Sequence, residues 1–84
     1  MQNHTKVYMN YFGYGEQDFI PCEICGSRAV DIHHIKPRSQ GGRDTIENLI
    51  ALCRKCHNAA HNELISKTDL YIIHESRTNI PNLF

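Results

Sequence analysis

The chain has 84 residues, of which 40% are hydrophobic and 21% are charged. A chain this short buries only a small core, which excludes several large domains and favours one domain, 1–84, that needs a metal or disulfides for stability. Nine basic residues balance nine acidic ones, so the net charge near pH 7 is zero and gives no general attraction to a polyanion.

The first segment, residues 1–20, is predicted to form a helix over His4–Phe12 that ends at Gly13. Apolar and aromatic side chains recur there at three- and four-residue spacings, at Val7, Tyr8, Tyr11 and Phe12. Such a stripe can stack nucleic-acid bases, but we favour an amphipathic helix packed on the core. The segment lacks a continuous apolar run and a cleavage site, so we expect a cytoplasmic protein with no signal peptide, transmembrane segment or membrane partner.

The middle segment, residues 21–66, has the order strand, loop, strand, helix. Apolar Val30 and Ile32 alternate with polar Asp31 and His33, which predicts a strand over residues 29–35. Pro37 and the Gly41-Gly42 pair predict a loop over residues 36–47. The apolar run Asn48–Leu52 is the second predicted strand. A helix is predicted from Arg54, favoured by Ala59, Ala60, Glu63 and Leu64.

The last segment, residues 67–84, is predicted to be a short helical tail. Leu70–Ile73 is an apolar run behind Thr68-Asp69, a pair that can cap a helix. This helix could cover the core or form a dimer contact.

All four cysteines lie in the middle segment as two C-x-x-C pairs, Cys22 with Cys25 and Cys53 with Cys56. Each pair can supply two thiolates from one tight turn, and tetrahedral zinc takes four thiolates at roughly 2.3 Å. Disulfides and buried free thiols are the alternatives, but nothing in the chain indicates an oxidising compartment. The spacing therefore predicts a structural zinc site.

The run between Asp31 and His61 contains a histidine pair, H-H-I-K-P-R-S-Q-G-G, then an asparagine and two histidines four residues apart. It resembles the active-site signature of the HNH endonucleases, and its first half is especially similar to the colicin DNase branch. The rest is similar in general terms to small HNH proteins of phages and prophages. The resemblance implies an α+β chain, namely a zinc-stapled ββα-metal domain with an N-terminal helix and a C-terminal helical tail.

The resemblance also implies roles for single residues. The family's three letters fall on His34 as general base, Asn48 as the residue that orients it, and His57 as a metal ligand. A catalytic divalent metal would be held by His33, His57 and His61. Asp31 lies on the same strand face as His33, where it can accept a hydrogen bond from a ligand imidazole.

One feature of the strand is in tension with these roles, because strict alternation sends His33 and His34 to opposite faces. They can share a site only where the strand ends or twists. His4 and His74 lie outside the motif and receive no predicted role.

The function that the resemblance implies is metal-dependent hydrolysis of DNA phosphodiester bonds, by nicking or double-strand cleavage. The catalytic ion could be Mg²⁺, Mn²⁺, Ni²⁺, Co²⁺ or Zn²⁺, although nitrogen ligands favour the transition metals. Between residues 28 and 55, six basic side chains outnumber three acidic ones. The expected DNA contacts are in this region, at Lys36, Arg38, Arg43, Arg54 and Lys55.

Two further hypotheses stay open beside the enzyme. The chain could be a zinc-dependent DNA-binding module with no reaction, or a docking subunit of a larger phage or restriction complex that is inactive alone. A neutral chain makes weak phosphate contacts, which favours help from a homodimer or another partner. Against the first, a purely structural zinc site has no use for His34 beside His33.

Overall fold

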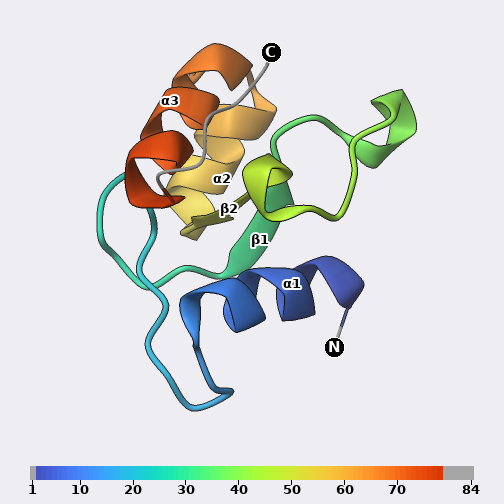
Figure 1. Cartoon of the computed structure of the whole chain (residues 1–84). Coiled ribbons are helices and arrows are strands. Elements are labelled where there is room, and N and C mark those ends of the chain that lie inside the picture. Colours follow the sequence, from blue (N-terminus) through green and yellow to red (C-terminus); the bar gives the residue numbers. More distant parts are fainter. Residues whose placement is uncertain (1, 79–84) are drawn as a thin grey trace.

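The structure is a computed structural model that describes residues 2–78, and these residues form an α+β fold around a two-stranded antiparallel sheet (Figure 1). The predicted order of helix, strand, loop, strand, helix, helix is confirmed. Residues 79–84 of the predicted tail lie outside the described residues. The elements are α1 (Asn3–Phe12), β1 (Asp31–His34), the 3-10 turns η1 (Arg38–Gln40) and η2 (Ile46–Asn48), β2 (Leu49–Leu52), α2 (Arg54–His61) and α3 (Lys67–Thr78).

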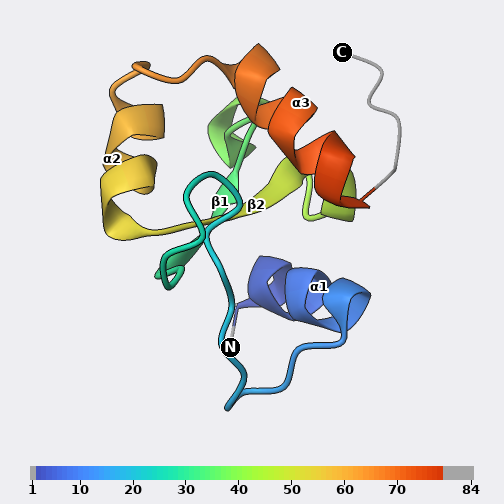
Figure 2. The ribbon, with the colours of Figure 1, turned by 90° about the vertical axis from the view of Figure 1, so that its left-hand side faces the viewer.

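Strand β2 is buried on both faces. It pairs with β1 so that Asp31 lies opposite Leu52 and His34 opposite Leu49, and all four of its side chains are fully buried. Because side chains alternate along a strand, Leu49 and Ala51 pack with Tyr8 of α1, whereas Ile50 and Leu52 pack in the cluster that holds the cysteines and Leu70 of α3. Figure 2 shows α1 on one side of the hairpin and the other two helices opposite.

Helix α1 packs on the core, as its aromatic stripe predicted. Gly13 ends the helix in the left-handed region at φ 73°, and its N–H bonds back to the last turn. Tyr8 is fully buried, while Tyr11 is 45% exposed and its hydroxyl donates to the carbonyl of Thr78 at 2.9 Å. The stripe is therefore a packing face that joins α1 to β2 and to the end of α3.

The structure corrects the boundaries of three predicted elements in the middle segment. Strand β1 covers four residues instead of seven, and Asn48 belongs to η2 instead of the second strand. Helix α2 ends at His61, before Glu63 and Leu64. Glu63 has a φ of 60°, a left-handed conformation that breaks the helical path.

Helix α3 is longer than a short tail and starts from a different cap. It has twelve residues, and the hydroxyl of Ser66 accepts from the backbone N–H of Asp69 at 3.1 Å. Thr68 and Asp69 lie inside the first turn. Leu70 and His74 are buried against the core. Of the two predicted roles for this helix, covering the core or forming a dimer contact, the structure shows the first.

A buried polar cluster joins three parts of the chain. Tyr8 of α1 donates to Glu23 at 2.6 Å, and the Nδ1 of His74 of α3 lies 2.9 Å from the same carboxylate. The Nε2 of His74 bonds to the carbonyl of Ile46 at 2.5 Å. Burial and the Glu23 carboxylate raise the pKa of Tyr8, which keeps its hydroxyl protonated as a donor. No helix within residues 2–78 has the length and apolar character needed to cross a membrane.

Candidate functional site

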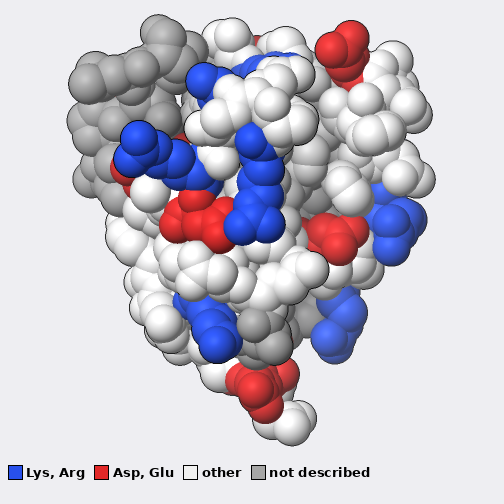
Figure 3. Space-filling model, turned by 90° about the vertical axis from the view of Figure 1, so that its right-hand side faces the viewer, with Lys and Arg blue, Asp and Glu red and all other residues white. Residues whose placement is uncertain are grey.

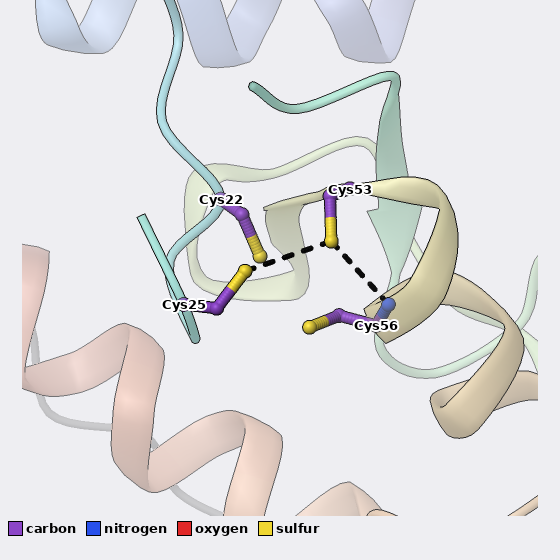
Figure 4. A group of neighbouring side chains, drawn as sticks. All are labelled: Cys22, Cys25, Cys53 and Cys56. Carbon is purple, nitrogen blue, oxygen red and sulfur yellow. Dashed lines mark hydrogen bonds between the residues drawn. The ribbon is translucent and has the colours of Figure 1, made fainter. Parts of the chain in front are cut away.

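The four cysteines converge from two elements, as their spacing predicted (Figure 4). Cys22 and Cys25 lie in a tight turn, the cysteine knuckle (residues 21–28), where Gly26 has a φ of 81°. Cys53 is the N-cap of α2, and its sulfur accepts from the N–H of Cys56. All four thiols are free, and their sulfur atoms lie within 4.8 Å of one another.

These sulfur atoms fit a tetrahedral zinc ion. Zinc–thiolate bonds of roughly 2.3 Å place neighbouring sulfurs about 3.8 Å apart, and the sulfurs of Cys25 and Cys53 are 3.6 Å apart. That separation is far longer than a disulfide bond. Hydrogen bonds from Ser27 lower the pKa of Cys25 to about 6, and burial raises the pKa of Cys56. The cluster is consistent with the predicted zinc site, in which the bound ion would crosslink the cysteine knuckle to the start of α2.

Asn48 closes the loop between the two strands; the predicted role of this residue in orienting His34 stays a prediction. Its amide oxygen accepts from the N–H of Lys36 at 2.8 Å, and its amide nitrogen donates to the carbonyls of Lys36 and Arg43. The loop is so tight that a Cβ on Gly42 would lie 1.8 Å from the Lys36 carbonyl oxygen. The hydroxyl of Tyr71 on α3 also donates to Asn48, at 3.2 Å.

His34 faces this closed loop and helix α1. Its Nε2 lies 2.7 Å from Oδ1 of Asp44, and its ring centroid is 4.6 Å from that of His4. The other oxygen of Asp44 accepts from Asn3 at 3.1 Å and from Arg38 at 3.3 Å. The hydrogen bond with His34 has the largest effect and the one from Asn3 the next; both lower the pKa of Asp44 and keep its carboxyl group ionised.

His33 faces the opposite side of the strand and approaches His57 on α2. Their ring centroids are 5.2 Å apart in an edge-on arrangement. Burial, followed by the neighbouring imidazoles with His57 foremost, lowers the pKa of His33 to about 4. A neutral imidazole is the form that binds metals, so His33 is ready to act as a ligand near neutral pH.

His57 also meets Asp31, the residue predicted to hydrogen-bond a ligand imidazole. The Nδ1 of His57 lies 2.9 Å from a carboxylate oxygen of Asp31. The angle of this approach is not that of a hydrogen bond, so within the described chain this buried nitrogen has no hydrogen-bond partner. This nitrogen is buried, has no hydrogen bond and lies next to a carboxylate. It could therefore donate its lone pair to a metal ion.

His61 completes the predicted ligand set only loosely. It is exposed on the last turn of α2 and lines an open cleft of about 540 Å³ together with His33. Within residues 2–78, two groups of potential metal ligands have donor atoms within 4.8 Å of one another: the four cysteines, and His4 with His34 and Asp44. The donor atoms of His33, His57 and His61 are not all within 4.8 Å of one another, and the role of these residues as a metal site stays a prediction.

The five basic residues expected to contact DNA are exposed, but acidic neighbours accompany some of them. Arg38 reaches Asp44, and Arg54 lies 3.8 Å from Asp31. Figure 3 shows Lys and Arg side chains interleaved with acidic ones on one face, instead of a continuous basic surface.

Sequence reasoning missed the residues that surround the motif. Asp44 and His4 pack against His34, and Tyr71 contacts Asn48. Asp44 gave only a weak signal, as an acidic residue in the loop between the motif residues. His4 and Tyr71 gave none, because they lie in flanking helices and reach the site only through tertiary packing.

Comparison with known proteins gives matches to nucleases. The HNH endonuclease family matches residues 22–63. The chain is 40% identical over 50 residues to the type IV methyl-directed restriction enzyme EcoKMcrA of Escherichia coli K12, covering 48% of this chain and 18% of that protein. It is 36% identical over 62 residues to the probable mobile endonuclease C of Enterobacteria phage T4, covering 74% of this chain and 29% of the relative.

A third relative is not named as a nuclease. The chain is 40% identical over 60 residues to a mitochondrial DNA mismatch repair protein mutS homolog of Sarcophyton glaucum, covering 63% of this chain and 6% of that protein. The chain thus spans less than a third of the length of each of these curated relatives. The matched residues include both cysteine pairs, the histidine pair, Asn48 and the α2 histidines. This chain belongs to the HNH endonuclease family.

Proposed function

We propose that the protein is a metal-dependent DNA endonuclease that hydrolyses phosphodiester bonds with His34 as general base. The observation that carries the proposal is the placement of His33 and His34 at the end of β1. There His33 meets His57, and His34 is held beside the loop that Asn48 closes. Membership of the HNH family and the two nuclease relatives support the same reaction class.

His33, His57 and His61 would hold one divalent ion, which supplies a positive charge that stabilises the charge developing on the phosphate. The low pKa of His33 and the Nδ1 of His57, which lacks a hydrogen bond, support the first two as ligands. Asp31 lies 2.9 Å from this same nitrogen, so with Nδ1 as the donor its carboxylate would face the bound ion and would not hold the ring from its other nitrogen. Imidazole donors suit Mn²⁺, Co²⁺, Ni²⁺ or Zn²⁺ better than Mg²⁺, which prefers oxygen.

His34 would take one proton from a water molecule in line with the scissile bond. The resulting hydroxide attacks phosphorus, the bond from phosphorus to the 3′ oxygen breaks, and the leaving oxygen takes up a proton. The products are a 5′-phosphate and a 3′-hydroxyl, so one water is consumed for each bond broken. Asn48 does not react; it holds the loop that bears the groups packed on His34.

DNA is the proposed partner, contacted through Lys36, Arg38, Arg43, Arg54 and Lys55. Because the chain has no net charge, its phosphate contacts are few, and tight binding would need a homodimer or a larger complex. Plasmid cleavage by the purified chain decides between an enzyme that acts alone and a binding module or docking subunit.

The test is cleavage of supercoiled plasmid across Mg²⁺, Mn²⁺, Co²⁺, Ni²⁺ and Zn²⁺, with metal content measured in the same preparation. His34→Ala should keep fold, metal and DNA binding but lose roughly 10²-fold or more of the rate, the scale of a general base. His57→Ala should lose the loosely bound metal and the activity together. Wild-type cleavage rates in His34→Ala, with metal retained, contradict the proposed base.

A further inference from the structure

We propose that Asp44 is a positioning residue that fixes the tautomer of His34, and that helix α1 completes this arrangement through Asn3 and His4. The inference rests on the proposed role of His34 as the general base. It gives two further parts of the chain a role in the reaction. One is a carboxylate in the loop, and the other is helix α1, which lies outside residues 22–63, the part that matches the family.

The chemistry of the contact determines which ring nitrogen carries the proton. An ionised carboxylate only accepts hydrogen bonds, so the Nε2 of His34, 2.7 Å from Oδ1 of Asp44, must be the donor. When the ring is neutral, its single N–H is then on Nε2 and its lone pair is on Nδ1. A base needs a lone pair, so the contact assigns proton uptake to Nδ1.

Asp44 is itself held in place from two further directions. Asn3 of α1 donates to its second oxygen at 3.1 Å, and Arg38 of η1 reaches the same oxygen at 3.3 Å. The side chain of Asp44 is 15% exposed and that of His34 is 14% exposed, so water has little access to compete for the bond between them. Both oxygens of the Asp44 carboxylate thus have hydrogen-bond partners: Oδ1 contacts His34, and Oδ2 accepts from Asn3 and Arg38.

Helix α1 also limits the position of the His34 ring. The ring of His4 packs against it at 4.6 Å between centroids, tilted by 50°. Burial, then the proximity of His34, lowers the pKa of His4 and favours its neutral form. The imidazole of His34 thus has a hydrogen bond at one nitrogen and a ring beside its face, which together restrict rotation about its side-chain bonds.

The first experiment is ¹⁵N NMR of the imidazoles in the zinc-loaded protein, without a second metal or DNA, at a pH of about 8 where a free imidazole is neutral. Comparison with His34→Ala assigns the His34 signals. The wild type should show His34 protonated at Nε2, and Asp44→Ala should show a mixture of tautomers or the opposite one. An Nδ1–H ring in the wild type, or an unchanged tautomer in Asp44→Ala, overturns the proposal.

The second experiment measures kcat and KM for plasmid cleavage. Asp44→Asn and Asp44→Ala should lower kcat by roughly 10- to 10²-fold, the scale for groups that orient a reacting residue, with KM changed less than about threefold. Asp44→Glu should recover part of the loss, because it restores an acceptor carboxylate. Asn3→Ala should give a smaller loss in kcat. Glu16→Gln, an exposed acid away from the site, is the matched control and should match the wild type.

These outcomes separate the two proposals. If His34→Ala is inactive while both Asp44 variants cleave at the wild-type rate, the positioning role is wrong and the base assignment stands. If His34→Ala is fully active, the base assignment is wrong, and the NMR result still tests the contact with Asp44.

A metal ion bound by His4, His34 and Asp44 is the competing explanation for their proximity. Titration of Zn²⁺ into the zinc-loaded protein distinguishes it, since His4→Ala and Asp44→Ala should bind as many ions as the wild type. Loss of one bound ion in both variants overturns the positioning role in favour of a metal site.

Discussion

The Nδ1 of His74 lies 2.9 Å from the carboxylate of Glu23, and both side chains are fully buried. His74 faces an acceptor at each ring nitrogen, because its Nε2 bonds to the carbonyl of Ile46. Both ring nitrogens thus contact oxygen atoms. The contact with Glu23, 51 residues apart in sequence, joins the cysteine knuckle to α3, and the bond to Ile46 joins α3 to η2, which contains Asn48.

Removing one partner of this pair should destabilise the protein strongly. Glu23→Gln leaves a single acceptor oxygen for the buried contacts with Tyr8 and His74, so the free energy of unfolding should fall by about 1–3 kcal/mol. Urea unfolding at pH 7 measures it. The double variant Glu23→Leu/His74→Leu should lose less than the sum of its single variants, because the two side chains contact each other directly. A loss below about 1 kcal/mol for Glu23→Gln contradicts the prediction.

The elements of the fold were predictable because local signals define them. The three- and four-residue spacing in α1, the glycine after it, and the alternation in β1 act over a few residues. Each C-x-x-C pair is also a local signal, and the four-thiolate chemistry of zinc predicted that the two distant pairs meet. Boundaries were less predictable: α2 ends at His61 because Glu63 adopts a left-handed backbone that no sequence pattern marks.

The surroundings of the motif histidines could not be predicted, since they depend on how distant segments meet. The contact of Asp44 with His34 forms only when Asn48 and Gly42 close the loop. Strand alternation sends His33 and His34 to opposite faces, and in the structure His33 lies toward α2 and His34 toward α1. That both histidines act at one site, as the family resemblance implies, stays a prediction.

Zinc removal should unfold the domain. The purified protein should carry one tightly held zinc ion per chain, because four thiolates make a closed site and the small core is stabilised by the link between knuckle and α2. A strong chelator, or the substitution Cys22→Ser, should abolish cooperative thermal unfolding monitored by circular dichroism. Full stability after metal removal, or a disulfide between Cys22 and Cys53 in the native protein, refutes this assignment.

Cys25 should be the first cysteine that an alkylating agent modifies in the zinc-loaded protein. It is the exposed member of the four, so the reagent reaches its zinc-bound thiolate first. Cys22, Cys53 and Cys56 are buried and should react later. Brief iodoacetamide labelling followed by peptide mass spectrometry gives the order. Equal labelling of all four cysteines contradicts the prediction.

Acid should destabilise the protein partly through His33. Its folded-state pKa of about 4 lies below the usual 6.5, so between these values the unfolded chain binds more protons than the folded one. This contribution to stability is constant above pH 6.5 and falls as the pH drops toward 4. His33→Asn lacks the titrating group, and should therefore lose less stability than the wild type between pH 7 and 4.5. Urea midpoints at the two pH values, compared between the proteins, measure the difference; equal losses contradict it.

Tyr71→Phe should lower the cleavage rate by acting through Asn48. The lost hydroxyl donates to the Asn48 amide oxygen at 3.2 Å, so Asn48 should hold the loop around His34 less firmly and kcat should fall by less than about tenfold. Tyr11→Phe is the matched control, because it deletes one hydroxyl bond between α1 and α3 without touching Asn48. Each variant should lose about 0.5–1.5 kcal/mol of stability. Only Tyr71→Phe should lose activity in plasmid cleavage, and an equal change in kcat for both variants means that α3 acts on stability alone.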